Sequence, residues 1–280
     1  SKGKPDRKGI LLVGPPGIGK TTIALATASE FGWKVVELNA SEQRNAAVLR
    51  RAAMSGAVHS SLDSWSSSGK DASRTLILLD EVDHLGGSFR KVSEKRIELS
   101  FDLEAEGGLK GDSGGKAELL RILEETQQPV IMTCNDKMRL YGRSDWRANE
   151  TRIRKFADII EFRRVTTMNL ETIARRVLKE EEISIDGPAL DAMIRNNSGD
   201  IRALINDLQC AVENGHITLQ SALDQIEIGR RDAHVEVFEG VKRMFEAPTN
   251  RDAASVAREL DRSPSELRTW LSWTTTINRS

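Results

Sequence analysis

The residues best suited to chemistry lie near the start of the chain, in a short run rich in glycine. The run fits the pattern G-x-x-x-x-G-K-[ST], in which backbone N–H groups of a turn surround the phosphates of a nucleotide. A helix that begins at the end of the turn would direct its positive end at the same anion. We therefore predict an ATP-binding loop made of Gly14, Pro15, Pro16, Gly17, Ile18, Gly19, Lys20, Thr21 and Thr22.

Two side chains of this loop have distinct predicted roles. Lys20 can reach the β- and γ-phosphates, and the Thr21 hydroxyl can bind Mg²⁺. The alternative is a glycine-proline turn that binds no ligand. The nucleotide interpretation is favoured because an apolar run, Gly9–Val13, precedes the turn and a helical pattern, Thr21–Phe31, follows it.

An acidic pair, Asp80-Glu81, follows the fully apolar run Thr75–Leu79. Asp80 would hold the Mg²⁺ shell, and Glu81 would polarise the attacking water. The alternative is two surface carboxylates at the end of a strand. The phosphate loop elsewhere in the same chain favours the catalytic interpretation.

Asn135 and Arg202 are two further candidate catalytic residues. Asn135 follows an apolar run at Pro129–Thr133, where its amide can hold the water near the γ-phosphate; the alternative is a turn asparagine. Arg202 lies in Gly199-Asp200-Ile201-Arg202, at the first turn of an expected helix, and can contact the γ-phosphate. Its alternative is a solvated arginine.

The elements that must position these residues alternate between strands and helices, which predicts a parallel α/β sheet. The segment Gly86–Lys116 fits a strand and a helix equally well, and the serine-rich segment His59–Ser73 is expected to be a loop that contains Trp65. Trp146 is also expected in a loop. The expected strands are Gly9–Val13, Lys34–Leu38, Thr75–Leu79, Pro129–Thr133 and Asp158–Phe162, and the expected helices are Thr21–Phe31, Arg44–Ala57 and Lys116–Thr126.

After Arg164 the pattern becomes helical throughout. Asp200 is a candidate N-cap for a helix at Ile201–Asn214, and Thr218 can cap the next one. We expect an α/β domain at 1–164, a small helical domain at 165–230 and the start of a further helical domain at 231–280. Since the chain starts at Ser1 and stops within a helical pattern, we expect a fragment of a longer protein.

Composition limits the classes of protein. The 280 residues include 41 Lys plus Arg and 42 Asp plus Glu, a net charge of −1, which excludes a broadly basic nucleic-acid coat but not a local basic surface. No apolar run approaches the roughly 20 residues of a membrane span, so no membrane partner is expected. Two cysteines are too few for a disulfide framework. The four histidines lack the spacing of metal ligands.

Taken together, the glycine-rich loop, Asp80-Glu81, Asn135 and the motif around Arg202 resemble the AAA+ ATPases. Within that family, residues 37–45, Glu-Leu-Asn-Ala-Ser-Glu-Gln-Arg-Asn, resemble the ELNASDxR box of replication factor C, with Glu42 in place of the usual aspartate. Residues 79–83 and 201–208 resemble the same clamp loaders, and the similarity covers most of residues 9–230. It implies a P-loop AAA+ domain, a helical lid and the start of a helical collar.

The position of the chain within such an assembly is indicated by a missing motif. Clamp-loader small subunits carry Ser-Arg-Cys before the last strand, whereas the matching place here reads Lys155-Phe156-Ala157. The resemblance therefore favours a large subunit of archaeal type, although a displaced arginine at Arg152 or Arg154 remains an alternative. The implied partners are clamp-loader small subunits in a pentamer, a PCNA-type sliding clamp and primer-template DNA. The implied location is the cytoplasm of an archaeon or the nucleus of a eukaryote.

Two other functions stay open at this point. One is a self-assembling AAA+ DNA remodeller or helicase, which would need a trans-acting arginine of its own. The other is a checkpoint-type scaffold that binds ATP but barely hydrolyses it. Contacts to DNA would be made to phosphate by basic side chains. The candidates are Arg44, Arg50, Arg51, Arg90 and Lys91.

Overall fold

A computed structural model of the chain describes residues 7–41, 49–50, 74–90, 114–249, 252–253 and 256. The expected helix at Arg44–Ala57, except for its residues 49–50, and the expected loop at His59–Ser73 lie outside these residues, as does most of Gly86–Lys116. The described residues form two compact units. The first unit contains the described residues up to 166 together with 199–202, and the second contains 167–198 and the described residues from 203 onward.

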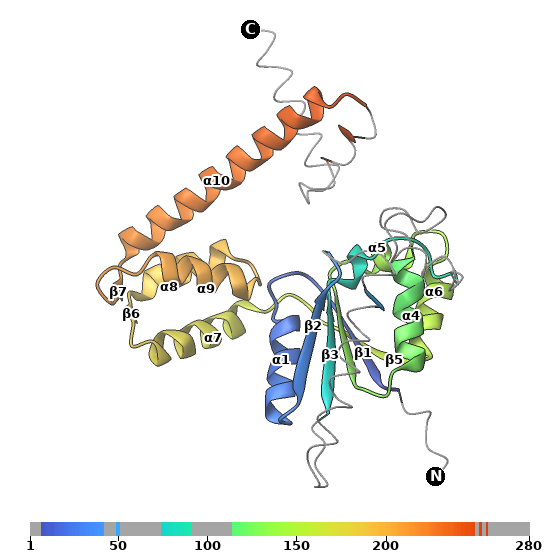
Figure 1. The fold of residues 1–280 in the computed structure, drawn as a ribbon. Coiled ribbons are helices and arrows are strands. Elements are labelled where there is room, and N and C mark those ends of the chain that lie inside the picture. Colours follow the sequence, from blue (N-terminus) through green and yellow to red (C-terminus); the bar gives the residue numbers. More distant parts are fainter. Residues whose placement is uncertain are drawn as a thin grey trace. The chain divides into compact units, whose positions relative to one another are not determined.

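A five-stranded parallel sheet forms the centre of the first unit (Figure 1). Its strands follow the order β2-β3-β4-β1-β5. The bounds of its strands lie within one residue of the expected ones at each end, which confirms the α/β prediction. All five strands end at the same edge of the sheet, here called the carboxyl edge, where ligands of such sheets bind. The strands are β1 (Gly9–Val13), β2 (Lys34–Asn39), β3 (Thr75–Asp80), β4 (Val130–Cys134) and β5 (Ala157–Glu161).

Helices cover both faces of this sheet (Figure 1). On one face, α1 (Lys20–Glu30) packs Ala24 and Ala28 against Leu12, Leu76 and Leu78. The other face is buried by helices that follow β3 and β4, through Leu119, Ile122, Leu140 and Ile153. These helices are α4 (Gly115–Glu125), α5 (Lys137–Tyr141) and α6 (Trp146–Arg154).

The placement of Trp146 in a loop was wrong, because this residue begins α6. The sequence of α6 is largely polar, and Ile153 is its only buried residue. A helix that buries a single side chain shows no repeating apolar stripe, which is the pattern that predicts a helix.

The second unit is mainly helical, as expected. Thr218 caps α10 through a reciprocal pair of hydrogen bonds with Ser221, each 3.1 Å long. Helix α9 ends at Cys210, before the expected end at Asn214, because the backbone of Glu213 pairs instead with His216 across a tight turn of positive φ at Asn214 and Gly215. The elements are α7 (Thr167–Glu180), β6 (Ser184–Ile185), α8 (Gly187–Asn196), α9 (Ile201–Cys210), β7 (His216–Ile217) and α10 (Leu219–Glu246).

Helix α10 is continuous across residue 230, where the lid was expected to end and a collar to begin. The division of the chain at 164 and 230 into three domains therefore stays a prediction. None of the described helices combines the length and the apolar character that a membrane span requires.

Candidate functional site

The glycine-rich loop joins β1 to α1 at the carboxyl edge of the sheet. A Cβ atom on Gly14 would lie 2.6 Å from the carbonyl oxygen of Phe162, so only glycine fits there. Gly17 and Gly19 have φ angles of 74° and 90°, in the region that glycine adopts without strain. The loop therefore needs its glycines for its shape, and α1 begins at Lys20 as the phosphate-binding interpretation requires.

Lys20 lies within this loop and is only 6% exposed. Its Nζ donates hydrogen bonds to the carbonyl oxygens of Gly14 (2.8 Å) and Pro15 (2.7 Å) and to Oδ1 of Asn135 (2.7 Å). These three acceptors use all three ammonium protons. Burial lowers the pKa of Lys20, and nearby acidic groups oppose that shift.

Asp80, at the end of β3, lies beside two hydroxyl groups. Thr21 Oγ1 donates to Asp80 Oδ1 at 3.0 Å, and the hydroxyl of Thr133 donates to the same oxygen. Hydroxyl and carboxylate oxygens are the hard ligands that Mg²⁺ prefers. The donor set formed by Thr21 and Asp80 thus fits the predicted magnesium site.

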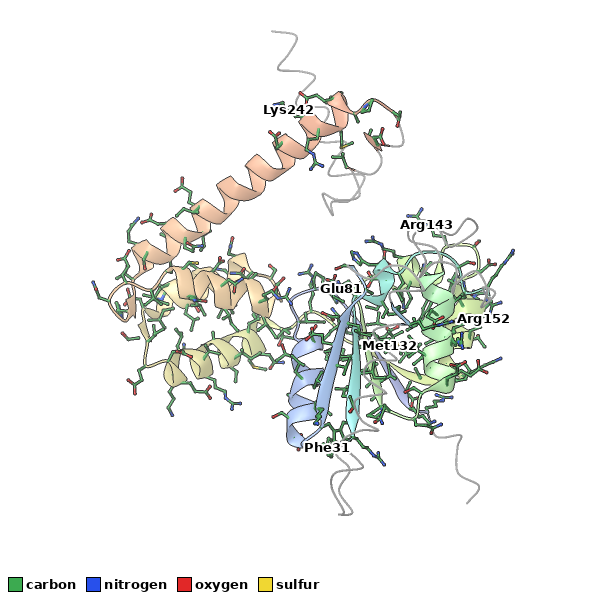
Figure 2. All side chains as sticks on the ribbon, in the orientation of Figure 1. Phe31, Glu81, Met132, Arg143, Arg152 and Lys242 are labelled. Carbon is green, nitrogen blue, oxygen red and sulfur yellow. The ribbon has the colours of Figure 1, made fainter. Side chains whose placement is uncertain are left out.

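Glu81 follows β3 directly at the carboxyl edge (Figure 2). Its φ of 55° and ψ of 45° place it in the left-handed region, which is uncommon for a residue other than glycine. The hydroxyl of Thr133 accepts the backbone N–H of Glu81 at 3.0 Å. One threonine of β4 thus holds both members of the acidic pair, and backbone strain of this kind is common at functional sites.

The segment Gly199–Arg202 lies against the glycine-rich loop. The carbonyl oxygen of Gly17 accepts the backbone N–H groups of Ile201 (2.9 Å) and Arg202 (3.1 Å). A Cβ atom on Gly17 would lie 2.0 Å from Oδ1 of Asp200, so a larger residue here would displace that carboxylate. Arg202 is exposed, and its charge contributes to the lowered pKa of Lys20, which places it within electrostatic range of the loop.

The structure brings most of the predicted site residues together. Lys20, Asp80 and Asn135 lie on three neighbouring segments that are directly linked by the hydrogen bonds above, and Thr22 is exposed on α1. Their catalytic and binding roles stay predictions. Arg154 pairs with Glu150 on α6, and Arg152 donates a hydrogen bond to an asparagine of the same helix. That either arginine takes the place of the one in the missing Ser-Arg-Cys motif stays a prediction.

The candidate DNA contacts are reduced by one finding. Arg50 donates two hydrogen bonds of 2.8 Å to the carboxylate of Glu118, and the two side chains are only 11% and 4% exposed. Arg50 therefore forms a largely buried ion pair with Glu118 and is not a free contact for phosphate. Arg90 is exposed, whereas Arg44, Arg51 and Lys91 lie outside the described residues.

Two side chains of this edge were missed by the sequence prediction. Thr133 holds Asp80 and Glu81, and the buried carboxylate of Asp83 accepts the backbone N–H groups of Asn135 and Asp136. The sequence did contain a signal for both residues, because each is a polar residue within an apolar, buried segment. Thr133 lies in the buried strand β4, and Asp83 follows the buried residue Val82. Their partners are far away in the sequence, so spacing could not reveal them.

Comparison with known proteins gives matches of two kinds. Residues 10–156 match the family described as ATPase family associated with various cellular activities (AAA). Among curated proteins, the Replication factor C large subunit of Halobacterium salinarum is 31% identical over 268 residues, 95% of this chain and 49% of that protein. The protein of the same name from Methanothrix thermoacetophila is 30% identical over 96% of this chain and 49% of its own length. The chain thus spans about half the length of these relatives.

Solved structures share the fold. The structure of the Thermotoga maritima RuvB Holliday junction branch migration motor superposes with a TM-score of 0.52 at 18% identity, over 89% of this chain and 74% of that one. A single-residue variant of the same RuvB gives a TM-score of 0.54 with the same identity and coverage. The sequence resemblance to replication factor C large subunits is confirmed by the curated relatives over nearly the whole chain, and the chain belongs to the AAA family of ATPases.

Proposed function

We propose that this chain is the ATPase portion of a sliding-clamp loader, in the position of its large subunit. The observation that carries the proposal is the junction of Lys20, Asp80 and Asn135 at one edge of the sheet, in a chain that is 31% identical to Replication factor C large subunit over 95% of its length. Such a junction suits a nucleoside triphosphate, because a cation is hydrogen-bonded to a neutral amide while the next residue, Thr21, bonds to a carboxylate that can hold a metal ion.

Each side chain has a role in ATP hydrolysis. Lys20 turns from the loop carbonyls to the β- and γ-phosphates, and Thr21 with Asp80 holds Mg²⁺. When bound, Mg²⁺ neutralises the charge that develops on the phosphate oxygens. Glu81 polarises the attacking water, Asn135 orients it, and Arg202 contacts the γ-phosphate and links the lid to the nucleotide state.

The partners follow from the missing Ser-Arg-Cys motif. An adjacent small subunit supplies the arginine that completes the ATP site, which is worth a factor of about 10³–10⁵ in rate. In a five-subunit assembly, ATP binding opens a PCNA-type clamp and grips primer-template DNA, and hydrolysis releases both. The archaeal relatives favour action in the cytoplasm of an archaeon.

The decisive experiment is steady-state ATP hydrolysis by the full-length protein. It is measured alone and then with a small subunit that carries Ser-Arg-Cys, a clamp and primed DNA. We expect slow turnover alone and strong stimulation in the mixture. Lys20→Ala should abolish the stimulated rate, whereas the matched control Lys137→Ala, an exposed lysine paired with Glu161, should keep it.

Two results would contradict the proposal. Rapid hydrolysis by the protein alone, rising with its own concentration, would indicate a self-assembling remodeller or helicase. Binding of ATP without turnover in either setting would indicate a scaffold of the checkpoint type.

A further inference from the structure

The segments that follow β3 and β4 are joined by side-chain hydrogen bonds, beyond the backbone pairing of the sheet. The backbone pairing of the two strands ends at Leu79 and Met132. Beyond that point, Oδ1 of Asp83 accepts the N–H of Asn135 at 3.0 Å and Oδ2 accepts the N–H of Asp136 at 3.3 Å. Asp83 lies in η1 (Val82–His84), two residues after Glu81, so it connects the turn that carries Glu81 to the segment that carries Asn135.

The chemistry of this contact requires a carboxylate. Asp83 is only 3% exposed, and a buried charge is tolerated when it accepts strong hydrogen bonds. Each of its oxygens takes a different amide, so one side chain fixes two successive peptide units. An asparagine at this position would offer one acceptor oxygen and would turn its own NH₂ group toward a backbone N–H.

The two peptide units held in this way lie on either side of the Asn135 Cα, and Asn135 is the residue of this segment that belongs to the candidate site. The backbone N–H of Asn135 bonds to Asp83, and its side-chain oxygen accepts from Nζ of Lys20 at 2.7 Å. A shift of this backbone would carry the amide of Asn135 away from Lys20 and from the phosphate that Lys20 is placed to bind.

We propose that Asp83 is a positioning residue for ATP hydrolysis, whose carboxylate holds the Asn135 amide at the phosphate site. The inference rests on the proposed function, since it assigns Asp83 a part in that reaction. Asp83 does not contact the reacting atoms and acts through Asn135. A purely structural residue would instead lower the fraction of folded protein and leave the rate per folded site unchanged.

A double-mutant cycle in the full-length chain, assembled with small subunits, clamp and primed DNA, tests this. Asp83→Asn should lower kcat by about 10- to 100-fold, since a displacement of about 1 Å can cost a factor of about 10². KM for ATP and the affinity for fluorescent ADP should change by less than about threefold. Asp83→Asn in the Asn135→Ala background should have no further effect on kcat, because the two residues act as one unit.

The matched control is Asp136→Asn. The Asp136 carboxylate also accepts a backbone N–H, that of Met138 at 2.8 Å, but it caps α5 and makes no hydrogen bond to Asn135 among the described residues. Asparagine caps a helix equally well, so kcat should stay at the wild-type value. Independent, multiplying losses in the double variant would overturn the proposal, as would equal losses of nucleotide binding and hydrolysis in Asp83→Asn.

Amide hydrogen exchange gives a readout that does not depend on clamp loading. The amides of Asn135 and Asp136 should exchange faster in Asp83→Asn and remain protected in the wild type. Unchanged exchange rates would overturn the proposal that Asp83 holds these two amides. A wild-type assembly that does not hydrolyse ATP would overturn the proposed function instead, and hydrogen exchange would still test whether Asp83 holds the Asn135 backbone. If Asp83→Asn does not assemble, Asp83→Glu, which displaces the same two oxygens by one methylene, replaces it in the cycle.

Discussion

The two units of the chain use polar side chains over very different distances in sequence. In the first unit, Lys20 bonds to Asn135 across 115 residues, and Thr133 bonds to Asp80 across 53. In the described part of the second unit, most side-chain hydrogen bonds join residues three or four apart, as Thr218–Ser221 does, and the longest spans 33 residues, from Leu219 to Asp186. This difference indicates that the geometry of the site depends on the assembled sheet, whereas many side-chain contacts of the helical unit form within a single helix or turn. Changes in the first unit should therefore have the larger effects.

The largest expected effect comes from Glu81→Gln. Glutamine keeps the size of the side chain but cannot accept the proton of the attacking water, so the stimulated rate of hydrolysis should fall by about 10²–10⁴. Nucleotide affinity should remain, since Glu81 does not belong to the loop. Phosphate release and fluorescent ADP titration measure the two quantities. Glu125→Gln, an exposed residue of α4 paired with Arg121, is the control and should behave as wild type. A parallel loss of ADP binding in Glu81→Gln would contradict its catalytic role.

The next effect concerns stability. Arg50→Ala should lower the free energy of unfolding by about 3–5 kcal/mol, because it leaves the Glu118 carboxylate buried without its partner. Urea unfolding followed by circular dichroism measures this change. The control is Arg176→Ala, which breaks a pair with Glu180 whose side chains are 80% and 64% exposed. That pair should contribute less than about 1 kcal/mol. Equal losses in the two variants would remove the contrast between long-range and local contacts.

A smaller effect is expected at the start of α10. Thr218→Ala removes the hydroxyl that accepts the Ser221 N–H, and the loss of an N-cap costs about 1 kcal/mol. Thermal unfolding should show a modest decrease in Tm, which Thr218→Ser should largely restore. Since the cap is local, the ATPase rate per folded molecule should not change. A loss of several kcal/mol would show that this helix depends on more than its own cap.

The smallest effect should be a gain. Gly229 lies inside α10, and a Cβ atom placed on it would meet no atom of the described residues within 4 Å, the backbone of its own helix aside. Gly229→Ala should therefore stabilise the protein by about 0.5–1 kcal/mol by reducing the freedom of the unfolded chain. Gly17→Ala is the opposite case, because a φ of 74° strains an alanine and its methyl group would displace the Asp200 carboxylate. Destabilisation by Gly229→Ala would indicate an unrecognised contact on this side of α10.

The central strands were predictable because a strand buried in a parallel sheet is apolar along its whole length. Thr75–Leu79 shows this pattern, and its bounds differ from those of β3 by one residue. Helix α6 was not predicted, because it buries only Ile153, and the order of the strands in the sheet was not predicted either. Arg50 shows why the environment of a charged residue could not be predicted. The sequence does not reveal that Glu118, 68 residues away, forms an ion pair with it that is largely buried.

By itself, the sequence determined the glycine-rich loop, the acidic pair after β3 and the amide after β4. Those features are local, because backbone geometry at a turn or at the end of a strand constrains the residue types within a few positions. Only the tertiary structure decided that Thr133 holds Asp80 and Glu81, that Asp83 holds Asn135, and that Asp200 lies against Gly17. Such contacts join segments far apart in the chain, and they exist only once the parallel strands have placed their carboxyl ends at one edge.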